Sequence, residues 1–196
     1  MLEDIKRKAL KDKVPIMEDE GIDYLVDFIK KNQYKKILEI GTGVGYSALK
    51  MAKIDPEIEI ITIERDRERY QQAMENIFKM GLNRQISVVN DDALKYDVTG
   101  KYDLIFIDAA KSQYIKFFEI YSKHLKKEGA IVTDNLKFHG LVGSDKSKFS
   151  KNLRSLVTKI EQYNEFLKTN EDFETEFVAV GDGLGISRRK KWKLNW

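Results

Sequence analysis

The segment Lys36–Ser47 reads KILEIGTGVGYS and joins a short apolar run to three alternating glycines. The run KILEI predicts a strand, and the residues from Tyr46 onward predict a helix. Gly41, Gly43 and Gly45 permit a tight turn between the two and let a ligand approach the backbone. The helix offers free N–H groups and the positive end of its dipole. Because the spacing is neither Gly-x-Gly-x-x-Gly nor that of a P-loop, the segment predicts a different ligand-binding turn.

Outward from this segment, apolar runs typical of strands alternate with helical patterns. The predicted strands are Lys36–Ile40, Ile58–Ile63, Ile86–Val89, Tyr102–Ile107, Ala130–Thr133, Glu176–Val180 and Leu184–Ser187. Such alternation predicts a mostly parallel sheet with helices on both faces. The short Gly-Asp-Gly spacer between the last two strands predicts a C-terminal antiparallel hairpin. We therefore expect an α/β, Rossmann-like fold with a seven-stranded sheet, which binds ligands beyond the carboxyl ends of its strands.

The composition of the 196 residues is that of one globular domain, with 42% hydrophobic residues and no cysteine. We expect a single domain over residues 1–196, with a short helical region at 1–34 and a basic tail at 188–196. That tail, RRKKWKLNW, has five basic residues and no acid, whereas the rest of the chain has 30 basic and 32 acidic residues. The N-terminal residues are too charged for a secretory signal, and no apolar stretch reaches the roughly 18 residues of a membrane span. The expected location is the cytoplasm.

Two acidic residues accompany the glycine turn. Glu39 lies two residues before Gly41, where a carboxylate repels a pyrophosphate but suits an ammonium group. Glu64 ends the second predicted strand, where an acid can accept hydrogen bonds from ribose hydroxyls. An aminoacyl nucleoside meets both demands, and the pattern resembles the S-adenosylmethionine-dependent methyltransferases. The alternative is a glycine turn with two incidental acids.

That resemblance implies one further contact with the cofactor. The residues Asn90–Leu94 follow the third predicted strand, where methyltransferases of this class place an acid near the adenine amino group. The resemblance assigns this role to Asp92, with Ala93 beside it.

Polar residues also end the fourth and fifth predicted strands. Asp108 follows one strand, and Asp134 and Asn135 follow the other. In neighbouring parallel strands these three side chains lie side by side, and their oxygens suit a hard cation such as Mg²⁺. Taken separately, Asp108 can be a helix N-cap and Asp134–Asn135 a turn.

Lys111 occupies the start of a predicted helix, where the helix dipole disfavours a cation. A metal ion nearby would lower the pKa of its amine. A neutral amine at this place could act as a general base toward a hydroxyl group of the substrate. The alternative is a solvated surface lysine.

Together the motifs resemble a narrower family. The segments ILEIGTGVGYS, IERD, IDAAK, TDN and VGDGLGIS are similar to those of metal-dependent O-methyltransferases related to the catechol and caffeoyl-CoA enzymes, over about Val14 to Arg189. The segments VPIM, FIDAAK and KIEQYNEFL, with the loop Phe138–Val142, most resemble bacterial tRNA 5-hydroxyuridine methyltransferases.

The resemblance implies a methyltransferase fold, S-adenosylmethionine and Mg²⁺ as cofactors, and a homodimer. The implied reaction converts wobble 5-hydroxyuridine in the anticodon region of tRNA to 5-methoxyuridine. The resemblance makes Lys111 and Asp108 catalytic, and Asp108, Asp134 and Asn135 metal ligands. The implied cofactor contacts are Met17, Glu39, Gly41, Gly43, Ser47, Glu64, Asp92, Ala93 and Asp108.

Two other functions fit the same sequence. One is a small-molecule O-methyltransferase of the catechol or caffeoyl-CoA type with the same machinery. The other is a non-catalytic nucleic-acid-binding protein with a vestigial cofactor site. Trp192 and Trp196 in the basic tail could stack on bases, or the tail could be a solvated terminus.

Overall fold

The computed structural model describes residues 1–191, which form one seven-stranded sheet with the order β3-β2-β1-β4-β5-β7-β6. The strands are β1 (Lys36–Ile40), β2 (Glu59–Glu64), β3 (Ile86–Asn90), β4 (Tyr102–Ile107), β5 (Leu125–Thr133), β6 (Phe173–Val178) and β7 (Leu184–Arg189). Neighbouring strands are parallel from β3 to β5, and β7 runs antiparallel to both β5 and β6. The predicted α/β sheet with its C-terminal hairpin is confirmed.

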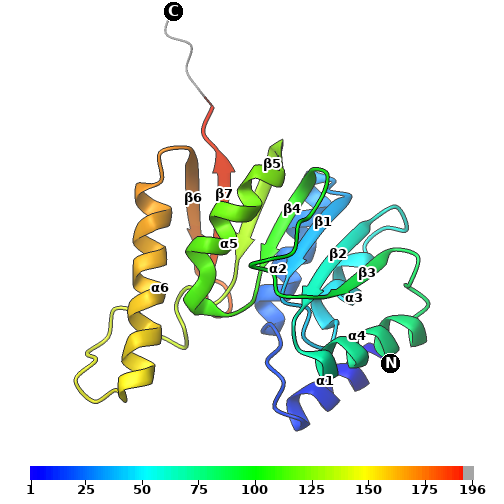
Figure 1. Cartoon of the computed structure of the whole chain (residues 1–196), viewed down its shortest axis with the longest axis horizontal. Coiled ribbons are helices and arrows are strands. Elements are labelled where there is room, and N and C mark those ends of the chain that lie inside the picture. Colours follow the sequence, from blue (N-terminus) through cyan, green and yellow to red (C-terminus); the bar gives the residue numbers. More distant parts are fainter. Residues whose placement is uncertain (192–196) are drawn as a thin grey trace, which may run out of the picture.

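Helices cover both faces of the sheet (Figure 1). They are α1 (Leu2–Lys11), α2 (Asp19–Asn32), α3 (Tyr46–Ala52), α4 (Arg67–Lys79), α5 (Tyr114–Tyr121) and α6 (Lys151–Thr169), with short 3-10 helices η1 (Lys111–Gln113) and η2 (Ser122–His124). Alternate residues of each strand point to opposite faces. In β1, Ile37 joins the core formed with α1 to α4, whereas Leu38 and Ile40 join the core formed with α5 and α6.

The structure corrects the bounds of three predicted elements. Strand β6 runs over Phe173–Val178 and not over Glu176–Val180. Strand β5 begins at Leu125 and not at Ala130, because Leu125 pairs with Tyr102 of β4 ahead of a register shift. Strand β7 ends at Arg189, so the predicted basic tail does not begin at Arg188. The guanidinium of Arg188 lies 5.1 Å from the ring centroid of Phe28, and that of Arg189 lies 5.0 Å from the ring centroid of Phe173. The predicted stacking by Trp192 and Trp196 lies outside the described residues.

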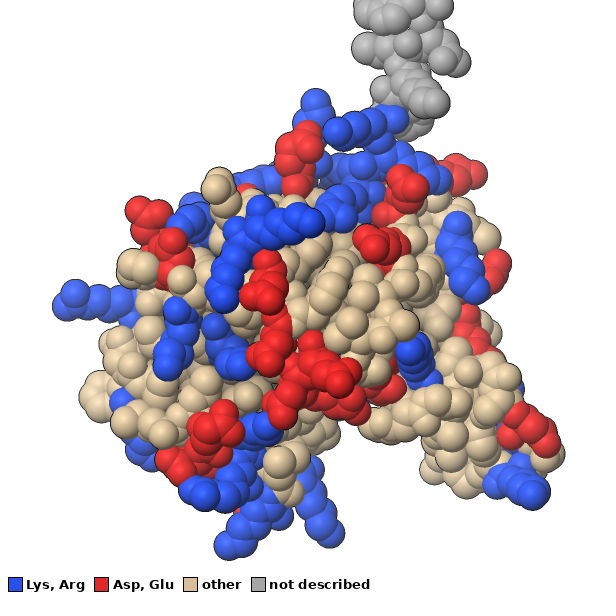
Figure 2. Space-filling view, turned by 180° about the vertical axis from the view of Figure 1, so that it is seen from behind, with Lys and Arg blue, Asp and Glu red and all other residues tan. Residues whose placement is uncertain are grey.

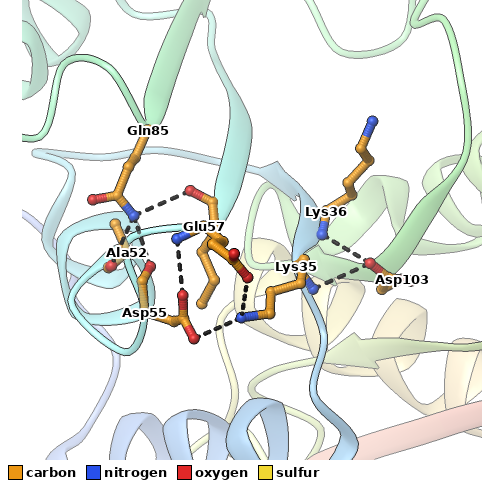
Figure 3. A network of polar contacts seen from close by, with 8 residues as sticks. Lys35, Lys36, Ala52, Asp55, Glu57, Gln85 and Asp103 are labelled. Atoms are coloured by element: carbon orange, nitrogen blue, oxygen red, sulfur yellow. Dashed lines mark hydrogen bonds and ion pairs between the residues drawn. The ribbon is translucent and has the colours of Figure 1, made fainter.

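Polar contacts fasten the amino ends of the strands, opposite the predicted site (Figure 3). Asp103 accepts hydrogen bonds from the backbone N–H groups of Lys35 and Lys36 and from the ammonium of Lys126. Burial alone would raise the pKa of Asp103, but the Lys126 ammonium and the backbone donors outweigh it and lower that pKa. The side-chain amide of Gln85 donates to the carbonyl groups of residues 52, 55 and 58, at 2.9–3.1 Å. Gln85 thereby holds the turn between α3 and β2 against the start of β3.

We predict that Gln85→Leu lowers the free energy of unfolding by about 1–3 kcal/mol, because buried carbonyl groups lose their donor. Chemical denaturation measures this change. The matched control is Gln71→Leu on the exposed side of α4, for which we expect a change within about 0.5 kcal/mol. Equal losses in the two variants would contradict the structural role of Gln85.

Candidate active site

A cavity of about 680 Å³ opens at the carboxyl edge of the sheet. The loops after β1, β2, β3, β4 and β5 line it, together with the segment between α1 and α2. The predicted site residues that line it are Met17, Gly41, Gly43, Ser47, Glu64, Asp92, Ala93, Asp108, Lys111, Asp134 and Asn135. The fold thus brings together every predicted site residue except Glu39, which is completely buried and absent from the cavity wall.

The glycine turn lies against the end of β4. A Cβ atom added to Gly41 would lie 2.1 Å from the carbonyl oxygen of Asp108, and the φ of Gly41 is +99°. Only glycine permits this contact and this conformation. Because of it, the loop after β1 and the loop after β4 form one continuous wall of the cavity.

Glu39 belongs to a buried chain of hydroxyl groups. Its carboxylate accepts hydrogen bonds from Ser47 and, at 2.5 Å, from Thr62. Thr62 and Thr42 share a further hydrogen bond of 2.6 Å, which connects the chain to the glycine turn. Burial raises the pKa of Glu39 to about 8, although the two hydroxyl donors oppose the shift. Glu39 braces the turn from within, and its direct contact with a ligand stays a prediction.

Glu64 and the residues after β3 frame the other end of the cavity. One carboxylate oxygen of Glu64 accepts from the N–H of Gly43 and the other from the N–H of Asp66, both at 2.9 Å. A carboxylate oxygen has a second lone pair, which leaves Glu64 able to accept a ribose hydroxyl. Asp92 caps its own turn by accepting from the N–H of Leu94 at 2.9 Å.

Acidic side chains from β4 and β5 meet Lys111 on the opposite wall. Asp134 is 2% exposed, and burial together with the nearby charge of Asp108 raises its pKa to about 8. Burial also raises the pKa of Asp108, against the attraction of the Lys111 ammonium. The ammonium of Lys111 donates to the side-chain oxygen of Asn135 at 2.7 Å and lies 5.9 Å from the ring centroid of Phe138.

The donor set at this wall is chemically suited to Mg²⁺. Asp108, Asp134 and Asn135 present oxygens, and the half-buried carboxylate of Asp108 beside the buried carboxylate of Asp134 favours a cation between them. Among the described residues, no group of three or more histidine, cysteine, aspartate or glutamate side chains could hold a metal ion. A metal site here therefore depends on the amide of Asn135 and stays a prediction.

Asp182 is the residue of this region that the sequence analysis missed. It lies in the turn between β6 and β7, is 6% exposed, and accepts hydrogen bonds from Asn135 and from the backbone of His139. The sequence indicates only a hairpin turn at Gly181–Gly183. The pattern Gly-Asp-Gly draws attention to Asp182, but the pattern does not indicate that the side chain of this aspartate is buried.

The fold and this cavity define a Rossmann-like methyltransferase. The chain belongs to the O-methyltransferase family, whose model matches residues 1–190.

A caffeoyl-CoA O-methyltransferase of Populus kitakamiensis is 31% identical over 185 residues, which cover 90% of this chain and 77% of that protein. The crystal structure of a "putative caffeoyl-CoA O-methyltransferase" from Staphylococcus aureus has a TM-score of 0.92 and 38% identity, over 96% of this chain and 92% of that one. An O-methyltransferase from Bacillus cereus, crystallised with SAH, shares the fold at a TM-score of 0.82 and 23% identity, over 96% and 90% of the two chains.

Within residues 1–191, no helix combines the length and the apolar character that crossing a membrane requires.

We predict that Gly41→Ala weakens binding of S-adenosylmethionine at least about tenfold, because the new methyl group displaces the backbone of Asp108. The matched control is Gly100→Ala, which has a φ of +84° but no atom within 4 Å of the added Cβ. The control should lose about 1–2 kcal/mol of stability and keep its affinity. Calorimetric titration measures both affinities, and equal affinities would contradict the prediction.

A second prediction concerns pH. The pKa of Glu39 rises from 4.5 to about 8 on folding, so the folded protein holds a proton that the unfolded chain releases. This contribution to stability is complete below pH 4.5 and declines as the pH rises toward 8, by up to about 1.4 kcal/mol per pH unit. We expect the difference in unfolding free energy between wild type and Glu39→Gln to shrink over this range. Denaturation at several pH values measures it, and a constant difference would show that Glu39 does not titrate there.

Proposed function

We propose that this protein transfers the methyl group of S-adenosylmethionine to a hydroxyl group of a small aromatic molecule that carries two neighbouring oxygens. The observation that carries the proposal is the meeting of Lys111, Asp134 and Asn135 on one wall of the cavity that the glycine turn begins. The similarity to caffeoyl-CoA O-methyltransferases over most of the chain supports an acceptor of this class.

The residues divide the cavity into two halves. Gly41 and Gly43 let the cofactor lie against the backbone, and Glu64 accepts hydrogen bonds from its ribose. Phe138 offers an aromatic face in the acceptor half of the cavity. The same half contains Lys111, whose amine can take the proton of the acceptor hydroxyl at Nζ. Holding the two reactants in line supplies much of the rate acceleration.

Mg²⁺ fits the acceptor half. Asp108, Asp134 and Asn135 would hold it, and when bound it supplies a Lewis acid that favours the ionised form of the acceptor hydroxyl. Burial raises the pKa values of Asp108 and Asp134, but beside the positive charge of Mg²⁺ both carboxylates would remain ionised.

The relatives favour a small acceptor over the tRNA that the sequence analysis expects. Their names describe caffeoyl-CoA enzymes. Figure 2 shows acidic side chains gathered near the centre of one face, with lysine and arginine interspersed around them. That face does not form the continuous basic surface that phosphate contacts require. Methylation of wobble 5-hydroxyuridine, the homodimer and the cytoplasmic location stay predictions.

An acceptor assay tests the proposal. Purified protein is incubated with S-adenosylmethionine, MgCl₂ and either caffeoyl-CoA, catechol or tRNA containing 5-hydroxyuridine, and products are identified by mass spectrometry. We expect a methylated catechol ring, and loss of product when EDTA removes the metal. Lys111→Met should lower kcat by about 10²–10⁴-fold because the general base is lost. The control is Lys148→Met, an exposed lysine of the loop after β5.

Three outcomes contradict parts of the proposal. Methylation of the tRNA alone would exclude the small aromatic acceptor, and full activity in EDTA would exclude the metal. Equal kcat values for Lys111→Met and wild type would remove Lys111 from the reaction.

A further inference from the structure

The turn between β6 and β7 contacts, through Asp182, the loop after β5 that lines the cavity. The backbone carbonyl groups of Asp182 and Gly183 accept hydrogen bonds from the N–H groups of Lys137 and Leu136, at 2.8 and 3.0 Å. Gly183 must be glycine here, because its φ is +85° and an added Cβ would lie 2.7 Å from the side chain of Lys137. The turn is therefore docked on the first residues of the loop after β5.

The side chain of Asp182 then joins two elements of the site. One carboxylate oxygen accepts from the side-chain N–H₂ of Asn135 at 3.1 Å, and the other accepts from the backbone N–H of His139. The imidazole Nδ1 of His139 also lies 3.7 Å from this carboxylate. Asp182 is only 6% exposed, and its buried carboxylate is thus satisfied by two donors, Asn135 and His139, from the loop after β5.

The polarity of these contacts fixes the direction of the Asn135 amide. A carboxylate only accepts hydrogen bonds and an ammonium only donates them. Asn135 lies between the two, with Asp182 on one side and Lys111 on the other. Its N–H₂ group must face Asp182, so its oxygen must face Lys111 and the cavity.

The backbone of this loop also needs an external support. Asn135, Phe138 and His139 all have a positive φ, of 61°, 46° and 54°. Such conformations are unfavourable for side chains larger than glycine, and most of all for bulky ones. The hydrogen bond from the His139 N–H to Asp182 holds the strained end of this segment in place.

We propose that Asp182 is a positioning residue for methyl transfer: it orients the Asn135 amide so that an oxygen faces Lys111, and it holds the loop 135–139 against the cavity. Asp182 itself does not line the cavity. The inference rests on the proposed function for its catalytic consequence, but the orientation of the amide is a property of the protein without ligand.

The first test exchanges one atom of the carboxylate. Asp182→Asn keeps the volume but replaces one acceptor oxygen by an N–H₂ group, which only donates. The variant side chain therefore cannot accept from Asn135 on one side and from His139 on the other. We expect kcat to fall about 10- to 100-fold, as for other residues that orient a ligand or base, while the affinity for S-adenosylmethionine is unchanged. Asp172→Asn, an exposed acid immediately before β6, is the matched control.

The second test reverses the polarity of the pair. In the double variant Asn135→Asp with Asp182→Asn, the new amide donates to the new carboxylate and still accepts from His139. An oxygen again faces Lys111, and aspartate tolerates the positive φ of position 135. We expect the double variant to recover most of the kcat that Asn135→Asp or Asp182→Asn loses alone. A purely structural role of Asp182 predicts instead that the two losses multiply.

NMR spectroscopy of the protein without ligand provides a readout that is independent of activity. We expect Asp182→Asn to shift the side-chain amide signals of Asn135 and to speed hydrogen exchange of the His139 N–H at least about tenfold. The double variant should restore that protection. If wild type methylates no acceptor, the proposed function fails while these signals still decide the orientation.

Wild-type kcat and unchanged NMR signals in Asp182→Asn would overturn the proposal, and so would a double variant that is no better than the single variants. If Asp182→Asn does not fold, the comparison of Asn135→Asp with the double variant decides: recovery of folding and activity supports the proposal, and absence of recovery overturns it.

Discussion

The contact between Gly41 and the carbonyl group of Asp108 is the constraint on which the site depends. It joins the turn after β1 to the end of β4, and these two strands lie at the centre of the sheet. On one side of the contact lie Glu64 and the residues after β3, and on the other lie Lys111 and the residues after β5. A cofactor and an acceptor can meet in one cavity because Gly41 has no side chain to separate the loop after β1 from the loop after β4.

Glu39, Asp134 and Asp182 are three of the buried carboxylates around the cavity, and each is satisfied in a different way. Glu39 receives two hydroxyl groups, Asp134 receives the backbone N–H of Asn135, and Asp182 receives an amide and a backbone N–H from the loop after β5. Burying a carboxylate is costly unless donors or a cation compensate it. Glu39 and Asp182 each have a donor on both carboxylate oxygens and act as supports. Asp134 has a donor on one oxygen only, which leaves its other oxygen able to bind a cation.

The sequence predicts this fold well wherever one local pattern decides an element. The glycine turn, the strand before it and the polar ends of β4 and β5 follow from periodicity and from the rule that parallel strands share their carboxyl edge. The start of β5 does not, because Lys126, Lys127 and Glu128 lack the apolar pattern, and the strand extends back to Leu125 through the pairing of Leu125 with Tyr102 of β4. Asp182 was missed for a related reason: its role arises from contacts with residues more than 40 positions away.

Two of the segments that line the cavity lie outside the sheet. One is the connection between α1 and α2, which contributes Val14, Pro15 and Ile16, and the other is the loop that contributes Phe138 and His139. Neither segment contributes a strand to the core. Changes at Phe138 and His139 can therefore alter the shape of the cavity without altering a strand, so the same reaction can serve different acceptors.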